Sequence, residues 1–255
     1  MTVQCYLSEI YSAIQGEGPL VGLRQLFIRF SACDLRCVWC DTPHSLVRTQ
    51  YCEIEEAPGN RDFKQINNPI EINELICFIK KLSPANHHSI SLTGGEPLLQ
   101  SNFMLSFLPV IKNEVLLPIY LETGGHRVNE LRQVIDHIDY ISMDFKLPSS
   151  AQTKPLWDEH KEFLDIAIGS KNVKKVWVKI VIVKNTNYAE LLKSINIVKS
   201  LNSTNNIEIY LQPVTQIGNS IPPDEKEILE LQFKLLSEYS NIRVLPQVHK
   251  LIGQM

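Results

Sequence analysis

Three cysteines are clustered in the stretch SACDLRCVWCDTPHS, which covers residues 31–45. Cys33, Cys37 and Cys40 follow a C-x3-C-x2-C spacing, and no fourth cysteine lies close to them. A structural metal site is usually closed by four ligands. Three thiolates on one tight loop can instead hold three irons of a [4Fe–4S] cube, which leaves the fourth iron open to a small molecule. The spacing therefore favours a cluster with an open coordination position.

Two other interpretations of these cysteines stay open on spacing alone. One is a tetrahedral zinc site made of the following residues: Cys37, Cys40, His44 and either Cys33 or Cys52. The other is a set of inert core thiols, because free cysteine is often buried. The cysteines outside the cluster lack any comparable spacing, and we interpret them as ordinary thiols: Cys5, Cys52 and Cys77.

The composition limits the classes of function. The chain has 255 residues, which fits one large domain over residues 1–255, and six cysteines, too few for a secreted disulfide scaffold. A net charge of −3 and a pI near 6.2 offer no footprint for nucleic acid or an anionic membrane. No signal peptide and no apolar run of about 18 residues is visible. These features predict a cytoplasmic protein with reduced cysteines and a small-molecule substrate.

Strand-like and helix-like segments alternate along the chain, which predicts parallel βαβ units. Apolar, β-branched runs predict strands over residues 24–31, 89–92, 119–122, 140–144, 176–183, 207–211 and 242–245. Amphipathic spacing predicts helices over residues 72–82, 98–112, 128–138, 155–168, 188–201 and 223–239. The polar insert over residues 43–69 is expected to be an exposed excursion and not a second domain. Periodicity alone does not distinguish an open sheet from a full or partial barrel.

Polar or glycine-rich segments follow most of these predicted strands. They are residues 33–42, 93–97, 122–125, 144–146 and 212–213. Loops after parallel strands gather at one end of an α/β fold, where ligands bind. Five such loops at one rim therefore predict an enzyme active site. A zinc site or inert core thiols would not explain the loops that follow the later strands.

At this point the cysteine loop resembles that of the radical S-adenosylmethionine (radical SAM) superfamily. The resemblance lies in C-x3-C followed by Val38-Trp39-Cys40 and in the later loop TGGEP at residues 93–97. It implies that SAM chelates the open iron, that Trp39 packs near the adenine, and that Gly95 and Glu96 bind the methionine moiety. A GGEP loop alone is weak evidence, but here it follows the cluster motif by one βα unit.

Further stretches resemble the 7-carboxy-7-deazaguanine synthase family within that superfamily. They are the lead AIQGEG at residues 13–18, the strand FIRF at residues 27–30, and the tail RVLPQVHK at residues 243–250. The middle also fits, with LETGG at residues 121–125 and SMDFKLPSS at residues 142–150. The resemblance extends from about residue 8 to residue 253.

This resemblance implies a fold and an activity. The fold would be a partial (β/α)6-type radical SAM barrel with an N-terminal extension and the polar insert after the cluster loop. The enzyme would convert 6-carboxy-5,6,7,8-tetrahydropterin to 7-carboxy-7-deazaguanine with loss of ammonia, a step toward queuosine and archaeosine. Its cofactors would be a [4Fe–4S] cluster, SAM that is regenerated in each turnover, and Mg²⁺. A reductant such as flavodoxin or ferredoxin and a homodimeric state are also implied.

The resemblance also implies roles for individual residues. Those implied to contact SAM are Trp39, Cys40, Asp41, Gly95, Glu96, Ser142, Lys146, Gln212 and Pro213. Those implied to contact the pterin are Ile14, Gln15, Gly16, Arg29, Thr93, Glu122, His249 and Met255. The resemblance also implies that Thr42 holds Mg²⁺. Without the resemblance, Thr42 is better interpreted as a turn residue before Pro43.

Several of these assignments have a plain structural alternative. Arg29 could form an ion pair within the protein and not with the pterin carboxylate, and Glu17 could be a solvated surface acid. The tail LIGQM departs from relatives that carry Trp after the terminal histidine, and SMDFKLPSS departs from a bacterial S-P-K-P. Rival functions are another radical SAM enzyme, such as a glycyl-radical activase, and a zinc or iron–sulfur protein with a structural or electron-transfer role. A tRNA-modifying enzyme is disfavoured by the missing basic surface.

Overall fold

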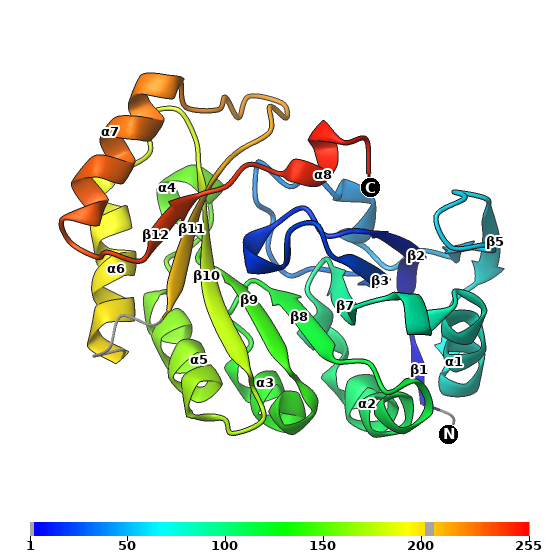
Figure 1. Ribbon diagram of the computed structural model, residues 1–255. Coiled ribbons are helices and arrows are strands. Elements are labelled where there is room, and N and C mark those ends of the chain that lie inside the picture. The colour runs from blue at the N-terminus through cyan, green and yellow to red at the C-terminus, as the bar shows by residue number, and fades with distance from the viewer. Residues whose placement is uncertain (1–2, 202–206, 255) are drawn as a thin grey trace.

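The fold is built on one large mixed sheet, as the ribbon of the computed structural model shows (Figure 1), and the structure describes residues 3–201 and 207–254. The ten strands of this sheet lie in the order β12-β11-β10-β9-β8-β7-β3-β2-β4-β5. Their bounds are β2 Leu7–Ile14, β3 Arg24–Phe30, β4 Tyr51–Glu55, β5 Phe63–Asn67, β7 Ser89–Gly94, β8 Ile119–Thr123, β9 Tyr140–Asp144, β10 Lys175–Ile182, β11 Glu208–Pro213 and β12 Ile242–Val244. A separate pair joins β1 Gln4–Cys5 to β6 Ile70–Glu71.

Seven neighbouring strands, from β3 through β12, pair in parallel. The helices of the connecting segments are α1 Ile72–Lys81, α2 Ser101–Val115, α3 Val128–Val134, α4 Pro148–Ala151, α5 Trp157–Gly169, α6 Tyr188–Leu201, α7 Glu225–Leu236 and α8 Val248–Leu251. Helices α2, α3, α5 and α6 lie along the outer face of the sheet (Figure 1). The predicted α/β fold of the partial-barrel type is confirmed.

Local sequence accounts for these elements. Strand β10, KVWVKIVI, is rich in β-branched residues and buries both of its faces. Helix α7 begins with a capping box, in which the Glu227 N–H donates to Asp224 Oδ1 (2.9 Å) and the Asp224 N–H donates to Glu227 Oε2 (3.0 Å). At α6 the predicted start is confirmed, because Asn187 Oδ1 accepts from the Ala189 N–H (3.0 Å).

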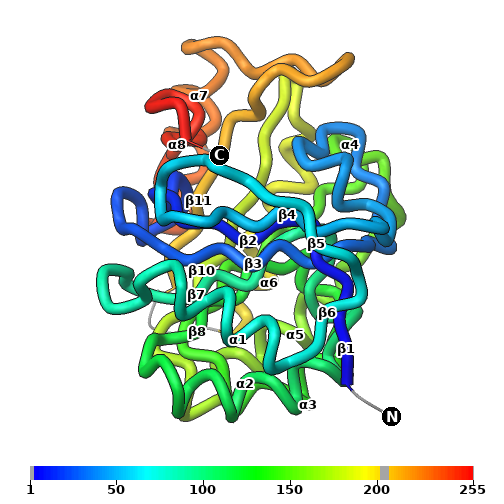
Figure 2. The backbone as a smooth tube through the Cα atoms, turned by 90° about the vertical axis from the view of Figure 1, so that its right-hand side faces the viewer, coloured from blue at the N-terminus to red at the C-terminus, as the bar shows by residue number. Residues whose placement is uncertain are grey.

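Two segments differ from the expectation. Residues 7–14, expected only as an extension, form β2, which pairs antiparallel with β3. The polar insert is not merely an exposed excursion, because β4 pairs parallel with β2 and β5 completes a hairpin at the sheet edge. Strand β4 alternates exposed and buried side chains over its first four residues, whereas β5 carries exposed and partly buried side chains without regular alternation. Strand β5 is the last strand at this edge of the sheet (Figure 2).

The core lies between the parallel strands and the outer helices. Its members include Phe30, Leu92, Phe107, Leu121 and Ile180, all of them fully buried. Within the described residues, no helix is both long and apolar enough to cross a membrane.

Candidate active site

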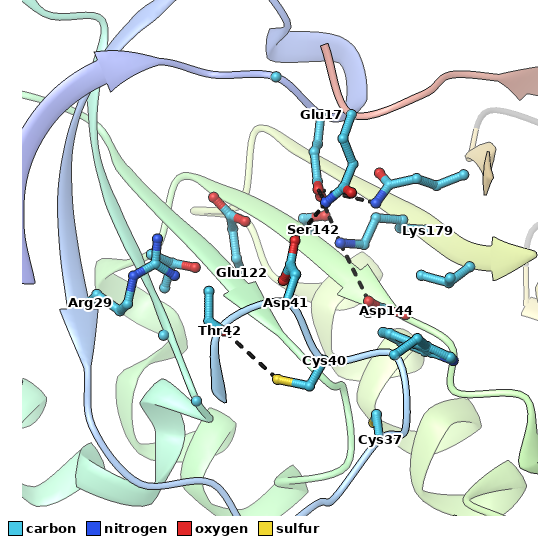
Figure 3. Close-up of a pocket in the computed structure, with 18 of the residues that line it drawn as sticks. Glu17, Arg29, Cys37, Cys40, Asp41, Thr42, Glu122, Ser142, Asp144 and Lys179 are labelled. Atoms are coloured by element: carbon cyan, nitrogen blue, oxygen red, sulfur yellow. Dashed lines mark hydrogen bonds and ion pairs between the residues drawn. The ribbon is translucent and has the colours of Figure 1, made fainter. Parts of the chain in front are cut away.

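A cleft of about 460 Å³ opens at the carboxyl ends of the parallel strands. Loops that follow β3, β7, β8, β9 and β11 all contribute to its lining, together with the segments 14–17 and 247–254. The predicted gathering of these loops at one rim is therefore what the fold produces. Figure 3 shows side chains from several of these elements pointing into the cleft.

The three clustered cysteines line this cleft. All are free thiols of intermediate exposure, on the loop that follows β3. Backbone bonds hold the loop, since the Cys33 N–H donates to the Leu46 carbonyl (3.2 Å) and the Cys40 N–H to the Cys37 carbonyl (3.1 Å). Burial raises the pKa of the Cys33 thiol to about 11 and also raises that of Cys37. Iron ligation would supply the positive charge that thiolates need here, and soft sulfur donors suit an iron–sulfur cluster.

The zinc alternative does not fit this geometry. Among the residues that the structure describes, no three His, Cys, Asp or Glu side chains converge on a single-ion site. His44 Nε2 lies 3.5 Å from Glu9 Oε1, and Cys52 is fully buried in β4. The three cysteines therefore suit separate irons of a cube better than one shared ion.

The loop after β7 packs directly on the cysteine loop. The Gly95 N–H donates to the Phe30 carbonyl (3.0 Å) and the Glu96 N–H to the Ala32 carbonyl (2.9 Å). A Cβ atom on Gly95 would lie 2.3 Å from the Ala32 oxygen, and Gly94 adopts φ +132°. Both glycines are therefore required for this close backbone approach, which places the GGE segment beside the cysteines.

The Glu96 carboxylate is buried and held by the loop after β8. It accepts from the Thr123 hydroxyl (2.8 and 3.0 Å), the Gly124 N–H (2.9 Å) and the Leu98 N–H (3.1 Å). Behind this loop His160 Nε2 donates to the Gly124 carbonyl (3.0 Å), and burial lowers the pKa of His160 to about 3. Three successive strand-end loops are thus joined by hydrogen bonds around Glu96.

An apolar patch with one cation lies beside the cysteines. Trp39 packs with Ala151, Val181 and Val214, and the Lys146 Nζ stands 4.4 Å from its ring centroid. The Trp39 Nε1 is buried without a protein partner. The sequence-predicted Ser142 also lines this side of the cleft and is buried. A flat apolar face next to unpaired polar atoms suits a nucleoside.

A second, polar part of the cleft contains Arg29 and Glu122. Arg29 Nε donates to Glu9 Oε2 (2.5 Å) and its Nη2 to the Tyr11 hydroxyl (2.6 Å), so the structural ion pair is present. Glu122 Oε1 accepts from Gln15 Nε2 (3.0 Å) and the Ser91 hydroxyl (2.8 Å).

The surroundings of both groups leave capacity for a ligand. Burial, together with the Glu17 charge, raises the pKa of Glu122. Within the described chain, Arg29 Nη1 and Glu122 Oε2 have no hydrogen-bond partner from the protein. Ile14 and Thr93 line the same region.

Sequence reasoning was wrong about Glu17 and missed Lys179. Glu17 is buried, not solvated, and accepts from Lys179 Nζ at 2.6 Å through Oε2. Lys179 also lies 3.4 Å from Asp144 Oδ2, which pairs with Lys146 at 2.8 Å. The available signal was a lysine inside a strand that is apolar on both faces, because such a charge needs a partner.

The tail motif closes one side of the cleft. The Val248 N–H donates to the Gly16 carbonyl (3.0 Å), and a Cβ on Gly16 would lie 2.2 Å from His249 Nδ1. Asp41 accepts from Lys250 Nζ (2.8 Å) and Gln247 Nε2 (2.9 Å), which lowers the pKa of Asp41 despite its burial. The sequence lead and tail are thus one structural unit (Figure 1).

The structure supports three of the predicted site residues less directly than the others. The Thr42 hydroxyl lines the cleft 3.8 Å from the Cys40 sulfur. Pro213 ends β11 but is not among the lining residues, whereas its neighbour Gln212 is. Met255 lies outside the described residues.

Comparison with known proteins supplies the family. Residues 27–198 match the model of the radical SAM superfamily. The chain is 39% identical over 252 residues to 7-carboxy-7-deazaguanine synthase of Geobacter sulfurreducens, covering 98% of this chain and 97% of the relative. The enzyme of the same name from Methanocaldococcus jannaschii is 29% identical over 98% of this chain and 100% of the relative.

A solved structure agrees in fold. The crystal structure of QueE from Escherichia coli superposes with a TM-score of 0.61 at 16% identity, covering 96% of this chain and 94% of that one. The packing of the GGE segment on the cysteine loop, which depends on Gly94 and Gly95, is consistent with these sequence matches. The chain belongs to the radical SAM superfamily and, within it, to the 7-carboxy-7-deazaguanine synthase family.

Proposed function

We propose that this enzyme converts 6-carboxy-5,6,7,8-tetrahydropterin to 7-carboxy-7-deazaguanine with loss of ammonia, in 7-deazapurine biosynthesis. The observation that carries the proposal is that Arg29 and Glu122 both line the polar part of the cleft, into which the cysteine loop also opens. Arg29 offers a cation, and Glu122 offers a partly buried acid with a raised pKa. The proposed substrate has matching ends, a carboxylate and a guanidine-like edge.

The polar part would bind the pterin through fixed groups. Gln15 bridges Glu122 and Gln25, each at 3.0 Å, so its side chain is held before any ligand arrives. Gly16 brings the backbone close to His249, and Thr93 lies at the end of β7 on the same wall. Side chains fixed in this way lose little freedom on binding, which favours one orientation of the ring.

Membership in the superfamily implies a [4Fe–4S] cluster and SAM as cofactors. Cys33, Cys37 and Cys40 would hold three irons of the cluster, and Gly95 lies beside them. When bound, the reduced cluster and SAM supply a 5′-deoxyadenosyl radical that takes a hydrogen from the substrate. The apolar face of Trp39 and the Lys146 cation would orient the nucleoside part toward the pterin.

Thr42, on the cysteine loop, would hold magnesium in the cleft. The Thr42 hydroxyl is an oxygen donor in the cleft, next to the last cysteine. Mg²⁺ prefers oxygen ligands and usually retains several waters. One protein hydroxyl is therefore a sufficient contribution when a substrate carboxylate and water supply the other ligands. Removal of Mg²⁺ with a chelator is expected to lower turnover without releasing the cluster iron.

The proposal can be tested by crossing the substrate with a variant. Protein reconstituted without oxygen is incubated with SAM, a reductant, Mg²⁺ and either carboxytetrahydropterin or its analogue without the carboxylate. The wild type should form 7-carboxy-7-deazaguanine and should bind the analogue at least about 10-fold more weakly, because a charge-assisted bond is lost. Arg29→Gln should bind both compounds about equally weakly.

Two results would contradict the assignment. Cleavage of SAM without any deazaguanine product would exclude this substrate and leave membership of the superfamily intact. An unchanged preference for the carboxylate in Arg29→Gln would remove Arg29 from substrate recognition. Cys40→Ser, which should lack an intact cluster, provides the background for product formation.

Three further features belong to the same proposal. We infer a single domain, supported by one continuous sheet from β5 to β12, and a homodimer, an expectation carried by the family. Light scattering on the purified protein tests the dimer. A flavodoxin or ferredoxin would supply the electron, which can be tested by replacing the chemical reductant with each of them.

A further inference from the structure

Glu17 is the centre of a buried hydrogen-bond network in the floor of the cleft. Its Oε2 accepts from Lys179 Nζ (2.6 Å). Its Oε1 accepts from Gln212 Nε2 (3.1 Å) and Gln247 Nε2 (3.0 Å). Three segments far apart in the sequence therefore meet on one carboxylate, as Figure 3 shows for Glu17 and Lys179.

One branch of the network leads to the polar part of the cleft. The Glu17 N–H donates to Gln15 Oε1 (2.9 Å), and Gln15 Nε2 donates to Glu122 (3.0 Å). Gln15 Nε2 also donates to Gln25 Oε1 (3.0 Å), so both of its amide protons are used within the protein. The placement of residue 17 thus sets the orientation of Gln15 and, through it, of Glu122.

The other branch leads to the nucleoside side. Lys179 lies between Glu17 and Asp144, and Asp144 Oδ2 pairs with Lys146 (2.8 Å). Lys146 in turn stands over the Trp39 ring. Contacts therefore continue without a break from Glu122 to Trp39, across the floor between the two parts of the cleft.

The pair at the centre is well shielded from water. The side chains of Glu17 and Lys179 are 10% and 15% exposed. Burial would raise the pKa of Glu17, but the Lys179 ammonium outweighs it and holds that pKa below its usual range. Loss of the Lys179 charge leaves Glu17 without this cation, and loss of the Glu17 charge leaves Lys179 with only Asp144, at 3.4 Å. In a poorly hydrated place either change is costly, so the surrounding side chains must move.

We propose that Glu17 is a positioning residue that holds the substrate part and the SAM part of the cleft at a fixed separation. This inference rests on the proposed function, in which a hydrogen atom passes between the two bound molecules. Such a transfer needs the reacting atoms near van der Waals contact, and a misplacement of about 1 Å is costly. Residue 17 acts on Gln15 through its backbone N–H and on Lys179 through its carboxylate, and it does not take part in the chemistry.

The test compares two buried carboxylates in matched substitutions. Glu17→Gln keeps the size of the side chain and removes its charge. Glu208→Gln is the control, because Glu208 is also buried, pairs with Lys175 at 2.8 Å, and does not line the cleft. The double variant Glu17→Gln with Lys179→Met removes both charges and keeps the test valid where Glu17→Gln alone does not fold.

Three quantities are measured for each protein. They are kcat/KM for product, the amount of 5′-deoxyadenosine released per molecule of product, and the affinity of cluster-free protein for the pterin by equilibrium dialysis. We expect Glu17→Gln and the double variant to lose roughly 100-fold in kcat/KM and to release about 10-fold more deoxyadenosine per product. Pterin affinity of the cluster-free protein should fall several-fold, and Glu208→Gln should change none of the three.

The inference is overturned if deoxyadenosine per product stays at the wild-type value in the folded Glu17 variants, whatever their rate. It is also overturned if Glu208→Gln raises that ratio equally, because general destabilisation would then be the cause. Failure of the proposed function would show in the wild type itself, which would form no product. The two failures are therefore distinct.

Discussion

Replacing Gly16 with alanine tests whether the sequence lead and tail act as one unit. A Cβ at this position would lie 2.2 Å from His249 Nδ1 and 2.3 Å from the His249 backbone nitrogen. Ordinary contact needs about 3.5 Å, so the segment that carries His249 must retreat by roughly 1 Å. Part of the obstacle is backbone, and a side-chain rotation alone does not remove it.

The magnitude follows from this displacement. A 1 Å shift of a substrate-contacting segment costs roughly 100-fold in kcat/KM. Overpacking costs about 1–3 kcal/mol of unfolding free energy, which a domain of this size tolerates. We therefore expect Gly16→Ala to remain folded, to bind iron normally and to be a poor catalyst, mainly through a higher KM for the pterin.

The assay combines steady-state kinetics, iron and sulfide content, and urea unfolding. Gly169→Ala is the matched control, because a Cβ there meets nothing within 4 Å. A Gly16→Ala enzyme with wild-type kcat/KM would refute the reasoning, since the tail would then be free to move without consequence for the substrate. Equal losses in the two variants would refute it as well.

Two further predictions concern the cysteines and the buried histidine. Cys40→Ser should lose most of its cluster iron after reconstitution whereas Cys77→Ser, at an exposed position on α1, should keep it; equal iron content would disprove the ligand assignment. Burial gives His160 a pKa of about 3 in the folded state, against 6.5 in the unfolded chain. As the pH decreases below 6.5, the unfolded chain takes up the proton and the folded chain does not, so the free energy of unfolding decreases. Replacing His160 by methionine should reduce the loss of unfolding free energy between pH 6.5 and about 5 by roughly 2 kcal/mol, measured by urea unfolding; an unchanged slope would contradict the assignment.

The parallel strands and the loops after them could be predicted from sequence because their signals are local. Strand β9 matches its predicted range, 140–144, and the other parallel strands agree within two residues at either end. Strand β2 was missed because LSEIYSAI is not an apolar run, although all but its last residue are buried. Some of its polar side chains have partners distant in sequence: the Ser12 hydroxyl lies 2.8 Å from His87 Nε2, and Glu9 accepts from Arg29. No local pattern announces such partners.

The residues of the cleft also differ in whether a local sequence signal predicts them. The cysteines, Gly95 and Glu96 line the cleft, and the sequence singled them out through short motifs whose spacing is itself the signal. Lys179 was missed because a single lysine within a strand has no motif, and its role depends on partners on other strands. Glu17 was misjudged because exposure depends on what covers a residue, and the cover here is the tail segment around Gln247.

The contact between Asp41 and Gln247 has a consequence for how the protein is made. These residues are 206 positions apart, so on a ribosome adding 5–20 residues per second the cysteine loop waits roughly 10–40 s for its cover. During that interval the loop is synthesised but the tail does not yet close over it. Delivery of iron and sulfide to the nascent chain would thus meet an open face, and maturation of the cluster need not begin by displacing the tail.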